Sequence, residues 1–472
     1  MQPTNRKSDS KNGQVKIEFT DKLITSWGGT AAIISRFLNK IKFKNVVEDC
    51  LPVKETSNNS TGEYSKVISL FISVLNGGFR FSHINYFDIN STVFRKCFNV
   101  SRFPKSSTGL TRYFNKYNKQ SINEKLLSGI GLFFLPSLLK ATGIAEDSLR
   151  FDSTVITRYG TQDGAKRGYN PQKKGRPSNQ PQIAFLGSGY TVNFWNRSGN
   201  TSSSNGIIGF FHQTLSFIPW LKITRVLADS GYYNREFLEV LESQKMEYII
   251  SAPLYSNLQK LIYQHETWET VAPGIEVSDF DFMHSAESWK GNRRYVIVRQ
   301  EIEKRPKASG KQLRLFEETE YGVSYRHSLL VTNNTKDSPY DIWNYYKPRA
   351  NDEKIIDNLK DGFGLSAFNL DNFWATEAVL MTICLILHNL ITYLIQHVIA
   401  EVGKNHKLRT IRMKYLIIPG QLGKNGRDYV LRLGISDPKR KSKFLQLIEK
   451  IELIFLHFNC NAVENSRQEI PS

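Results

Sequence analysis

The 472-residue sequence predicts an α/β protein with a mixed β-sheet flanked by helices, a β-rich insertion, an N-terminal helical domain and a helical C-terminal region. Two observations support this class. Short apolar runs bounded by Gly, Pro or Asn, which are typical of strands, begin only after about residue 145. Apolar residues with helical spacing precede these runs and return after about residue 340. The chain is long enough for two or three domains with a large buried core.

The first part of the chain is predicted to be a basic, DNA-binding region. Residues 1–25 should form a polar arm, and residues 26–144 a helical domain. Residues 1–150 contain 22 Lys and Arg against 11 Asp and Glu, so they hold more than half of the net charge of +19. Ser and Thr at 106–108 are N-cap candidates for a short helix that displays Arg112, Lys116 and Lys119. This helix could contact DNA phosphates; a merely solvated basic face is the alternative.

The predicted sheet belongs to a catalytic domain of residues 145–400. Strands are expected near 149–156, 181–187, 190–196, 223–229 and 247–253, with helices near 205–218 and 234–244. Three consecutive strands followed by alternating helices and strands suit a mixed sheet covered by helices. Alternating apolar runs at about 270–332 predict the β-rich insertion. The apolar segment 378–399 contains His388 and Asn389 and therefore predicts a buried helix, and residues 401–472 form a basic C-terminal region.

The composition favours some partners and disfavours others. A net charge of +19 and a pI near 9.5 favour a polyanionic partner, with nucleic acid ahead of an anionic membrane surface. The four cysteines lie far apart, so neither a disulfide framework nor a zinc finger is indicated, and a reducing cytoplasm fits best. The N-terminus has no apolar core of a secretion signal, and we expect no membrane partner. Neither a Walker A loop nor a dinucleotide fingerprint is present, so no nucleotide cofactor is expected.

Two aspartates occupy unusual places in the predicted strands. Asp152 interrupts an apolar strand, and Asp229 ends another. A carboxylate that is half-buried in a sheet costs several kcal/mol unless a cation or a donor compensates for it. A divalent metal ion could stabilise both acids, because Mg²⁺ prefers oxygen ligands. Taken singly, each aspartate is more often a helix cap or a turn former.

A predicted helix near residue 350 carries a polar stripe. At about 100° per residue, Tyr346, Arg349, Glu353 and Lys360 fall within about 60° of one another. Glu353 would complete a three-carboxylate metal site, while Arg349 and Lys360 would hold phosphate oxygens. The alternative is a solvated face with an Arg349–Glu353 pair. Pro348 belongs in a first helical turn, so Tyr346 is expected just outside the helix.

The spacing Tyr346-x2-Arg349-x3-Glu353-x6-Lys360 resembles the YREK signature of DDE transposases from bacterial insertion sequences. Asp152 in FDST and Asp229 in LADSGYYN resemble the first and second acidic residues of this family. The stretch GAKRGYNPQKKGRPSNQP is similar to a basic segment in one branch of these enzymes. The β-rich insertion also lies where that branch places its own. The resemblance covers about residues 145–400.

This resemblance implies a ribonuclease H-like catalytic core that binds two Mg²⁺ or Mn²⁺ ions through Asp152, Asp229 and Glu353. Such an enzyme cuts double-stranded DNA at the terminal inverted repeats of its own element and joins the 3′-OH ends to target DNA. Two ions about 4 Å apart can activate the attacking oxygen and stabilise the leaving oxygen. The resemblance gives Tyr346 and the two signature cations contacts with DNA phosphates near the cut. It also implies a homodimer on DNA and a cytoplasmic bacterial protein that joins the nucleoid when bound.

Several further predictions carry explicit alternatives. Trp289 in the insertion could stack on a flipped base, although a tryptophan in a β-domain core is the plainer interpretation. Two other functions stay open: a non-catalytic DNA-binding transposase remnant, and a ribonuclease H-like nuclease without strand transfer. The acidic trio disfavours the remnant, and the insertion and extended basic surface disfavour the nuclease. The basic segment could line the DNA path or form a solvated loop; its candidate DNA contacts are Lys166, Arg167, Tyr169, Lys173, Lys174 and Arg176.

Overall fold

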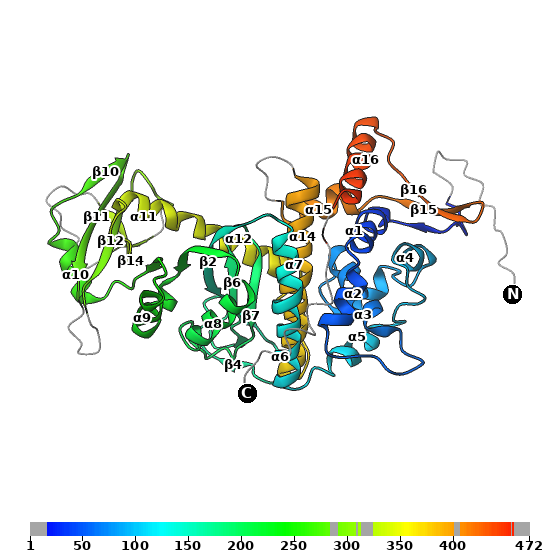
Figure 1. The fold of residues 1–472 in the computed structure, drawn as a ribbon, viewed down its shortest axis with the longest axis horizontal. Helices are drawn as coiled ribbons and strands as arrows, with labels where there is room; N and C mark the ends of the chain where they lie inside the picture. The colour runs from blue at the N-terminus through cyan, green and yellow to red at the C-terminus, as the bar shows by residue number, and fades with distance from the viewer. Residues whose placement is uncertain are drawn as a thin grey trace.

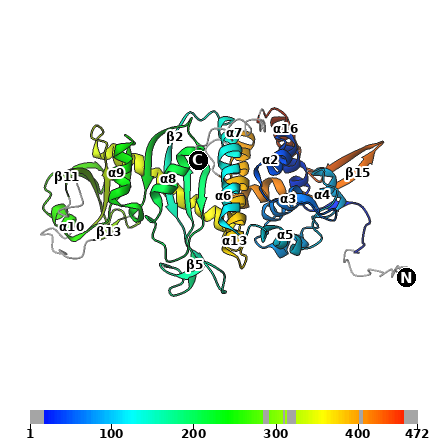
Figure 2. The same cartoon turned by 60° about the horizontal axis from the view of Figure 1, so that its bottom comes forward.

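The computed structural model describes residues 17–283, 291–307, 310–312, 324–400, 406–454 and 456. The molecule is elongated (Figure 1), with the β-rich insertion at one end, the central sheet in the middle and the N-terminal helices at the other end. Long helices stand between the central sheet and the N-terminal helices, as a second view confirms (Figure 2).

The central sheet contains five strands in the order β7-β6-β2-β8-β9. Strand β2 runs parallel to β8, and β8 runs parallel to β9, whereas β6 and β7 are antiparallel. The strands lie in the stretches that the sequence predicts, and the mixed sheet is consistent with a ribonuclease H-like fold. Their bounds are β2 Glu146–Ser153, β6 Gln182–Leu186, β7 Thr191–Trp195, β8 Lys222–Ala228 and β9 Tyr248–Ser251.

The insertion extends this sheet. Strand β14 (Tyr325–Thr332) pairs antiparallel with β9, so the sheet continues through β12 (Arg293–Glu301) and β11 (Ile275–Phe282) to β10 (Glu269–Ala272). The short strand β13 (Lys311–Gln312) also pairs with β14, which gives a ten-stranded sheet. Helix α10 (Ser256–Tyr263) precedes the insertion, and α11 (Pro339–Tyr346) packs on β11 and β12. The insertion is thus anchored through backbone hydrogen bonds to the catalytic sheet.

Aromatic packing joins the sheet to its covering helices. Phe151 on β2 lies between α8 (Ile207–Phe217) and α9 (Arg235–Ser243), with its ring 5.9 Å from that of Phe210 and 6.1 Å from that of Phe237. Such ring pairs add about 1 kcal/mol each beyond the area they bury. The face of β2 that carries Phe151 therefore packs in the core, and the residues next to Phe151 in the strand point to the opposite face of the sheet.

Two helices, Gln120–Lys140 and Phe373–Ile399, are long and apolar enough to cross a membrane. The apolar windows of these helices are 56% and 89% buried by the rest of the chain, as in interior helices of globular proteins. In Phe373–Ile399, the side chain of Asn389 accepts a hydrogen bond of 2.9 Å from the backbone N–H of Thr191 on β7. The predicted buried helix is confirmed, and its segments include α13 (Phe373–Met381) and α14 (His388–Tyr393).

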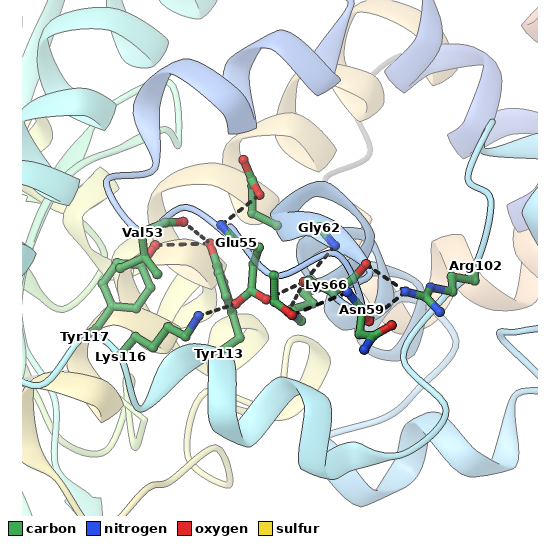
Figure 3. A network of polar contacts seen from close by, with 12 residues as sticks. Val53, Glu55, Asn59, Gly62, Lys66, Arg102, Tyr113, Lys116 and Tyr117 are labelled. Atoms are coloured by element: carbon green, nitrogen blue, oxygen red, sulfur yellow. Dashed lines mark hydrogen bonds and ion pairs between the residues drawn. The ribbon is translucent and has the colours of Figure 1, made fainter.

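The N-terminal domain is helical, as predicted, and one buried ion cluster fixes its loop 51–61 (Figure 3). Glu55 pairs with Lys66 at 2.5 Å and with Lys116 at 2.7 Å. Burial alone would raise the pKa of Glu55, but the hydrogen bonds from both lysines outweigh it and lower the pKa to about 2. The helices are α1 Ser35–Lys40, α2 Phe43–Cys50, α3 Gly62–Leu75, α4 Thr92–Cys97, α5 Ser107–Phe114, α6 Gln120–Gly129 and α7 Leu135–Lys140.

The C-terminal region differs from the helical prediction because it contains a β-hairpin. Strands β15 (Gly420–Asn425) and β16 (Asp428–Leu433) pair with each other, and β1 (Ile24–Thr25) from the predicted N-terminal arm pairs with β15. Asn-Gly at 425–426 favours a tight hairpin turn, and Gly426 has a φ of +60°. Helix α16 (Pro438–Glu452) follows and packs on α1. The two ends of the described chain thus fold together.

Candidate active site

Asp152 and Asp229 lie side by side at one edge of the central sheet. Asp152 is near the end of β2, and Asp229 follows directly after β8. Because these strands are parallel and Phe151 pairs with Ala228, the two aspartates occupy matching positions. Each Oδ1 accepts a backbone N–H, from Ser153 at 2.8 Å and from Gly231 at 2.9 Å. The local backbone therefore orients both carboxylates and leaves their Oδ2 atoms for another partner.

That partner is Arg349. Its Nη2 atom lies 3.2 Å from Oδ2 of Asp152 and 3.6 Å from Oδ2 of Asp229, so one guanidinium bridges both carboxylates. The side chain of Asp152 is 9% exposed, whereas that of Asp229 is 38% exposed. Burial raises the pKa of Asp152 to about 7, because desolvation and repulsion from Asp229 outweigh the attraction of Arg349. Two acids thus share one cation, and their negative charge is only partly compensated.

A second ion pair fixes the helix that follows Arg349. Arg150 on β2 donates to Asp352 at 3.0 Å and to the carbonyl oxygen of Pro348, also at 3.0 Å. Asp352 is fully buried, and this burial raises its pKa to about 6 against the attraction of Arg150. Sequence reasoning missed this pair. Because Arg150 and Asp152 are two apart on one strand, the alternation of side chains already places both on one face of the sheet.

Tyr346 contacts the strand that leads to Asp229, and the charge of Asp152 influences the pKa of Lys360. The Tyr346 hydroxyl donates to the carbonyl oxygen of Ala228 at 3.2 Å, and burial raises its pKa to about 12. Lys360 has its pKa lowered by burial, an effect that the charges of nearby acids including Asp152 oppose. Tyr346 ends α11, as the position of Pro348 predicts, and a short 3₁₀ turn, Lys347–Arg349, leads into α12 (Ala350–Asp357). Two of the four signature side chains, Tyr346 and Arg349, therefore make contacts at this edge, and the pKa of Lys360 is influenced by it.

Glu353 is placed differently. It is exposed on α12, one turn after Arg349, and makes no hydrogen bond or ion pair with any residue that the structure describes. Among those residues, no three His, Cys, Asp or Glu side chains form a group that could hold a metal ion. Asp352, the neighbour of Glu353, turns toward the sheet instead. The structure thus brings together two of the three predicted carboxylates.

The predicted basic segment ends beside the same end of β2, where the carbonyl oxygen of Pro181 accepts the backbone N–H of Thr154 at 3.1 Å. Strands β3 (Ile156–Thr157), β5 (Pro177–Asn179) and β4 (Lys166–Arg167) form a small separate sheet that holds it. In the part of the chain that the structure describes, none of its cations pairs with a carboxylate. The exposed side chains are Lys166, Arg167, Tyr169, Lys173, Lys174 and Arg176.

The other predicted DNA contacts divide into three cases. Arg112 is exposed on α5, as expected. Lys116 and Lys119 lie beyond α5, which ends at Phe114, so they do not share its face. Lys116 pairs with Glu55 because the loop 51–61 folds against it. Trp289 lies outside the described residues.

The fold and the site together define a class: an α/β protein with paired acids at the carboxyl ends of two parallel strands and a basic surface beside them. A family model described as Transposase DDE domain group 1 matches residues 7–454. The chain belongs to this family of DDE transposases, whose members transpose DNA through cleavage and strand transfer and generally use divalent metal ions such as Mg²⁺. A search of curated proteins found no match.

Proposed function

We propose that this protein cuts DNA at the terminal inverted repeats of its own element and joins the resulting 3′-OH ends to target DNA. The observation that carries this proposal is the convergence of Asp152 and Asp229 on one positive charge. Two buried or half-buried acids beside each other are costly, and such pairs are typical of sites that bind a cation or carry out chemistry. Membership of the transposase family indicates that the substrate is DNA.

Two residues at this edge, Asp152 and Asp229, offer oxygen ligands to a divalent metal ion. Carboxylate oxygens are the ligands that Mg²⁺ prefers, and both Oδ2 atoms already face a cation in the structure. We assign Asp152 and Asp229 as ligands, with Glu353 as the third. Two bound Mg²⁺ ions would activate the attacking oxygen and stabilise the leaving oxygen of the phosphodiester.

Arg349 has two partners in this proposal. In the DNA-free protein it holds the two aspartates, and in the DNA complex it binds phosphate oxygens near the cut, together with Tyr346 and Lys360. Its Nε atom is buried and has no hydrogen-bond partner among the described residues, so the aspartates leave part of its donor capacity unused. A guanidinium can bind a phosphate through two parallel hydrogen bonds. The four side chains together form the proposed YREK signature.

The basic segment of residues 164–181 guides the DNA to this site. Its exposed cations lack carboxylate partners among the described residues, and its last residue, Pro181, accepts the backbone N–H of Thr154, two residues after Asp152. Phosphate contacts of this kind position a duplex without reading its sequence. Because the two ends of one element must be paired, we expect the enzyme to act as a dimer on DNA. We place this activity in the bacterial cytoplasm.

One assay tests the proposal against its alternatives. Purified protein is incubated with labelled terminal-repeat DNA, with Mg²⁺ present or chelated. Mg²⁺-dependent cutting followed by joining supports the proposal. Cutting without joining identifies a ribonuclease H-like nuclease, and a shifted but uncut duplex identifies a DNA-binding remnant. The exposed position of Glu353 is the one observation that favours the remnant.

A further inference from the structure

The hairpin β15–β16 projects from the body of the molecule at the end far from the insertion (Figures 1 and 2). Strand β15 pairs with two residues of β1, whereas the outer edge of β16 pairs with no described strand. An unpaired edge of this kind invites association with other chains unless charges protect it. The charges found here are almost all of one sign.

The basic hairpin surface, defined as the exposed cations of residues 420–443, has few counter-ions. This stretch has seven Lys and Arg but only two acids, Asp428 and Asp437. Asp437 caps α16 by accepting the backbone N–H of Arg440 at 3.0 Å, so it serves the helix rather than a lysine. Within the described residues, no cation of the surface pairs with a carboxylate; its members are Lys424, Arg427, Arg432, Lys439, Arg440, Lys441 and Lys443.

The same surface continues onto the N-terminal domain. Tyr429 on β16 is 42% exposed, and the ammonium groups of Lys424 and Lys96 lie 5.5 and 4.8 Å from its ring centre. Lys96 is exposed on α4. Two cations therefore share one aromatic ring, although they lie more than 300 residues apart in the sequence. Like charges gathered in this way repel each other, and a polyanion relieves that repulsion.

The shape of the hairpin indicates which polyanion it binds. A two-stranded ribbon fits the major groove of B-DNA, which is about 12 Å wide. The turn from Lys424 to Asp428 is exposed and carries no large apolar side chain that could enter a lipid bilayer. These features favour duplex DNA over an anionic membrane.

We propose that the basic hairpin surface is a second DNA-binding site, separate from the edge that holds Asp152 and Asp229. Lys424, Arg427 and Arg432 contact phosphates on the two sides of a groove, and the first turn of α16 adds its lysines. This site holds duplex DNA away from the cut. It goes beyond the proposed catalytic function and does not depend on cleavage.

The test compares two triple variants of the full chain. Lys424→Gln/Arg427→Gln/Arg432→Gln removes three cations of the surface. The control, Lys44→Gln/Lys222→Gln/Lys304→Gln, removes three exposed lysines that already pair with Glu48, Glu146 and Glu301, so the net charge changes equally. Fluorescence anisotropy gives the affinity for a long duplex at several salt concentrations, and circular dichroism checks that both variants fold.

We expect the hairpin variant to reduce the slope of log Kd against log salt by about 2 to 3, since each phosphate contact contributes about 0.9. The control should change this slope by less than about 1. Equal slopes in the two variants would overturn the proposal. Loss of binding to phosphatidylserine vesicles without any change in the DNA slope would also overturn it, in favour of a membrane surface. This experiment measures binding alone, so its outcome does not depend on whether the protein cleaves DNA. The cleavage assay described above tests the catalytic proposal separately.

Discussion

Glu55 and Asp152 are both carboxylates that lie mostly buried beside cations, yet their pKa values move in opposite directions. Glu55 has two lysines to itself, and its pKa falls to about 2. Asp152 shares a single guanidinium with Asp229, and burial raises its pKa to about 7. The first cluster is complete and holds a loop in place. The second cluster has one positive charge for two carboxylates. A metal ion that bound there would supply the missing positive charge.

The largest expected effect comes from the incomplete cluster. Asp152→Asn or Asp229→Asn should lower the rate of Mg²⁺-dependent cleavage by about 10³ or more, because each removes a metal ligand whose charge stabilisation is worth several kcal/mol. DNA binding should remain. Gel analysis of labelled terminal-repeat DNA measures both. Asp147→Asn, at the other end of β2, is the control and should cut within about twofold of the parent protein. Normal cutting by either site variant would refute the assignment of that residue.

The complete cluster should instead control stability. Glu55→Gln should lower the free energy of unfolding by about 3 kcal/mol, because Lys66 would remain nearly buried without its partner. Denaturation in urea measures this loss. Glu48→Gln removes only an exposed partner of Lys44 and should cost less than about 0.5 kcal/mol. If both variants lost equal stability, the two clusters would not differ as described.

Arg349→Gln sharpens the comparison by removing the shared cation. Without DNA, Mn²⁺ should bind about tenfold more tightly, since the guanidinium no longer competes for the carboxylates, a difference of about 1.4 kcal/mol. The slope of log Kd for DNA against log salt should fall by about 1, the value for one lost phosphate contact. Electron paramagnetic resonance measures free Mn²⁺ in the first experiment. Arg36→Gln, which breaks an exposed pair with Glu452, should change neither quantity. Unchanged Mn²⁺ affinity in Arg349→Gln would contradict the competition.

The smallest effect is a dependence on pH. The lowered pKa of Glu55 means that its contribution to stability is fully present above its ordinary pKa of about 4.5 and is lost as the pH falls toward 2. The stability difference between the parent protein and Glu55→Gln should therefore shrink steadily below pH 5. Urea denaturation at pH 7, 5 and 4 follows this difference. A difference that grew as the pH fell would have the wrong sign for an ion-paired carboxylate.

Local patterns in the sequence predicted much of the fold. The strands that carry Asp152 and Asp229 and the long interior helix both depend on spacing within a few residues. The alternation of side chains in β2 also indicates that Arg150 lies on the same face of the sheet as Asp152. The Asn-Gly turn at 425–426 likewise signals the C-terminal hairpin.

Long-range contacts could not be predicted in this way. The bridge from Arg349 to two strands joins residues about 200 and 120 positions apart, and no local period encodes it. The uniform helix assumed for the stripe is interrupted by a 3₁₀ turn at Lys347–Arg349 and a π-helical turn at Asn358–Gly362. These turns change the angles between side chains, so the stripe is not one straight face. Pairing of β14 with β9, which extends the sheet into the insertion, also depends on distant residues.

The central claim is that the Asp152 carboxylate binds the metal ion used for DNA cleavage. The most direct measurement compares Asp152→Cys in Mg²⁺ and in Mn²⁺, using labelled terminal-repeat DNA. Mg²⁺ strongly prefers oxygen ligands, whereas Mn²⁺ accepts sulfur more readily. We predict that the variant is inactive with Mg²⁺ and regains cleavage with Mn²⁺. Cleavage with Mg²⁺ at the rate of the parent protein would contradict the claim.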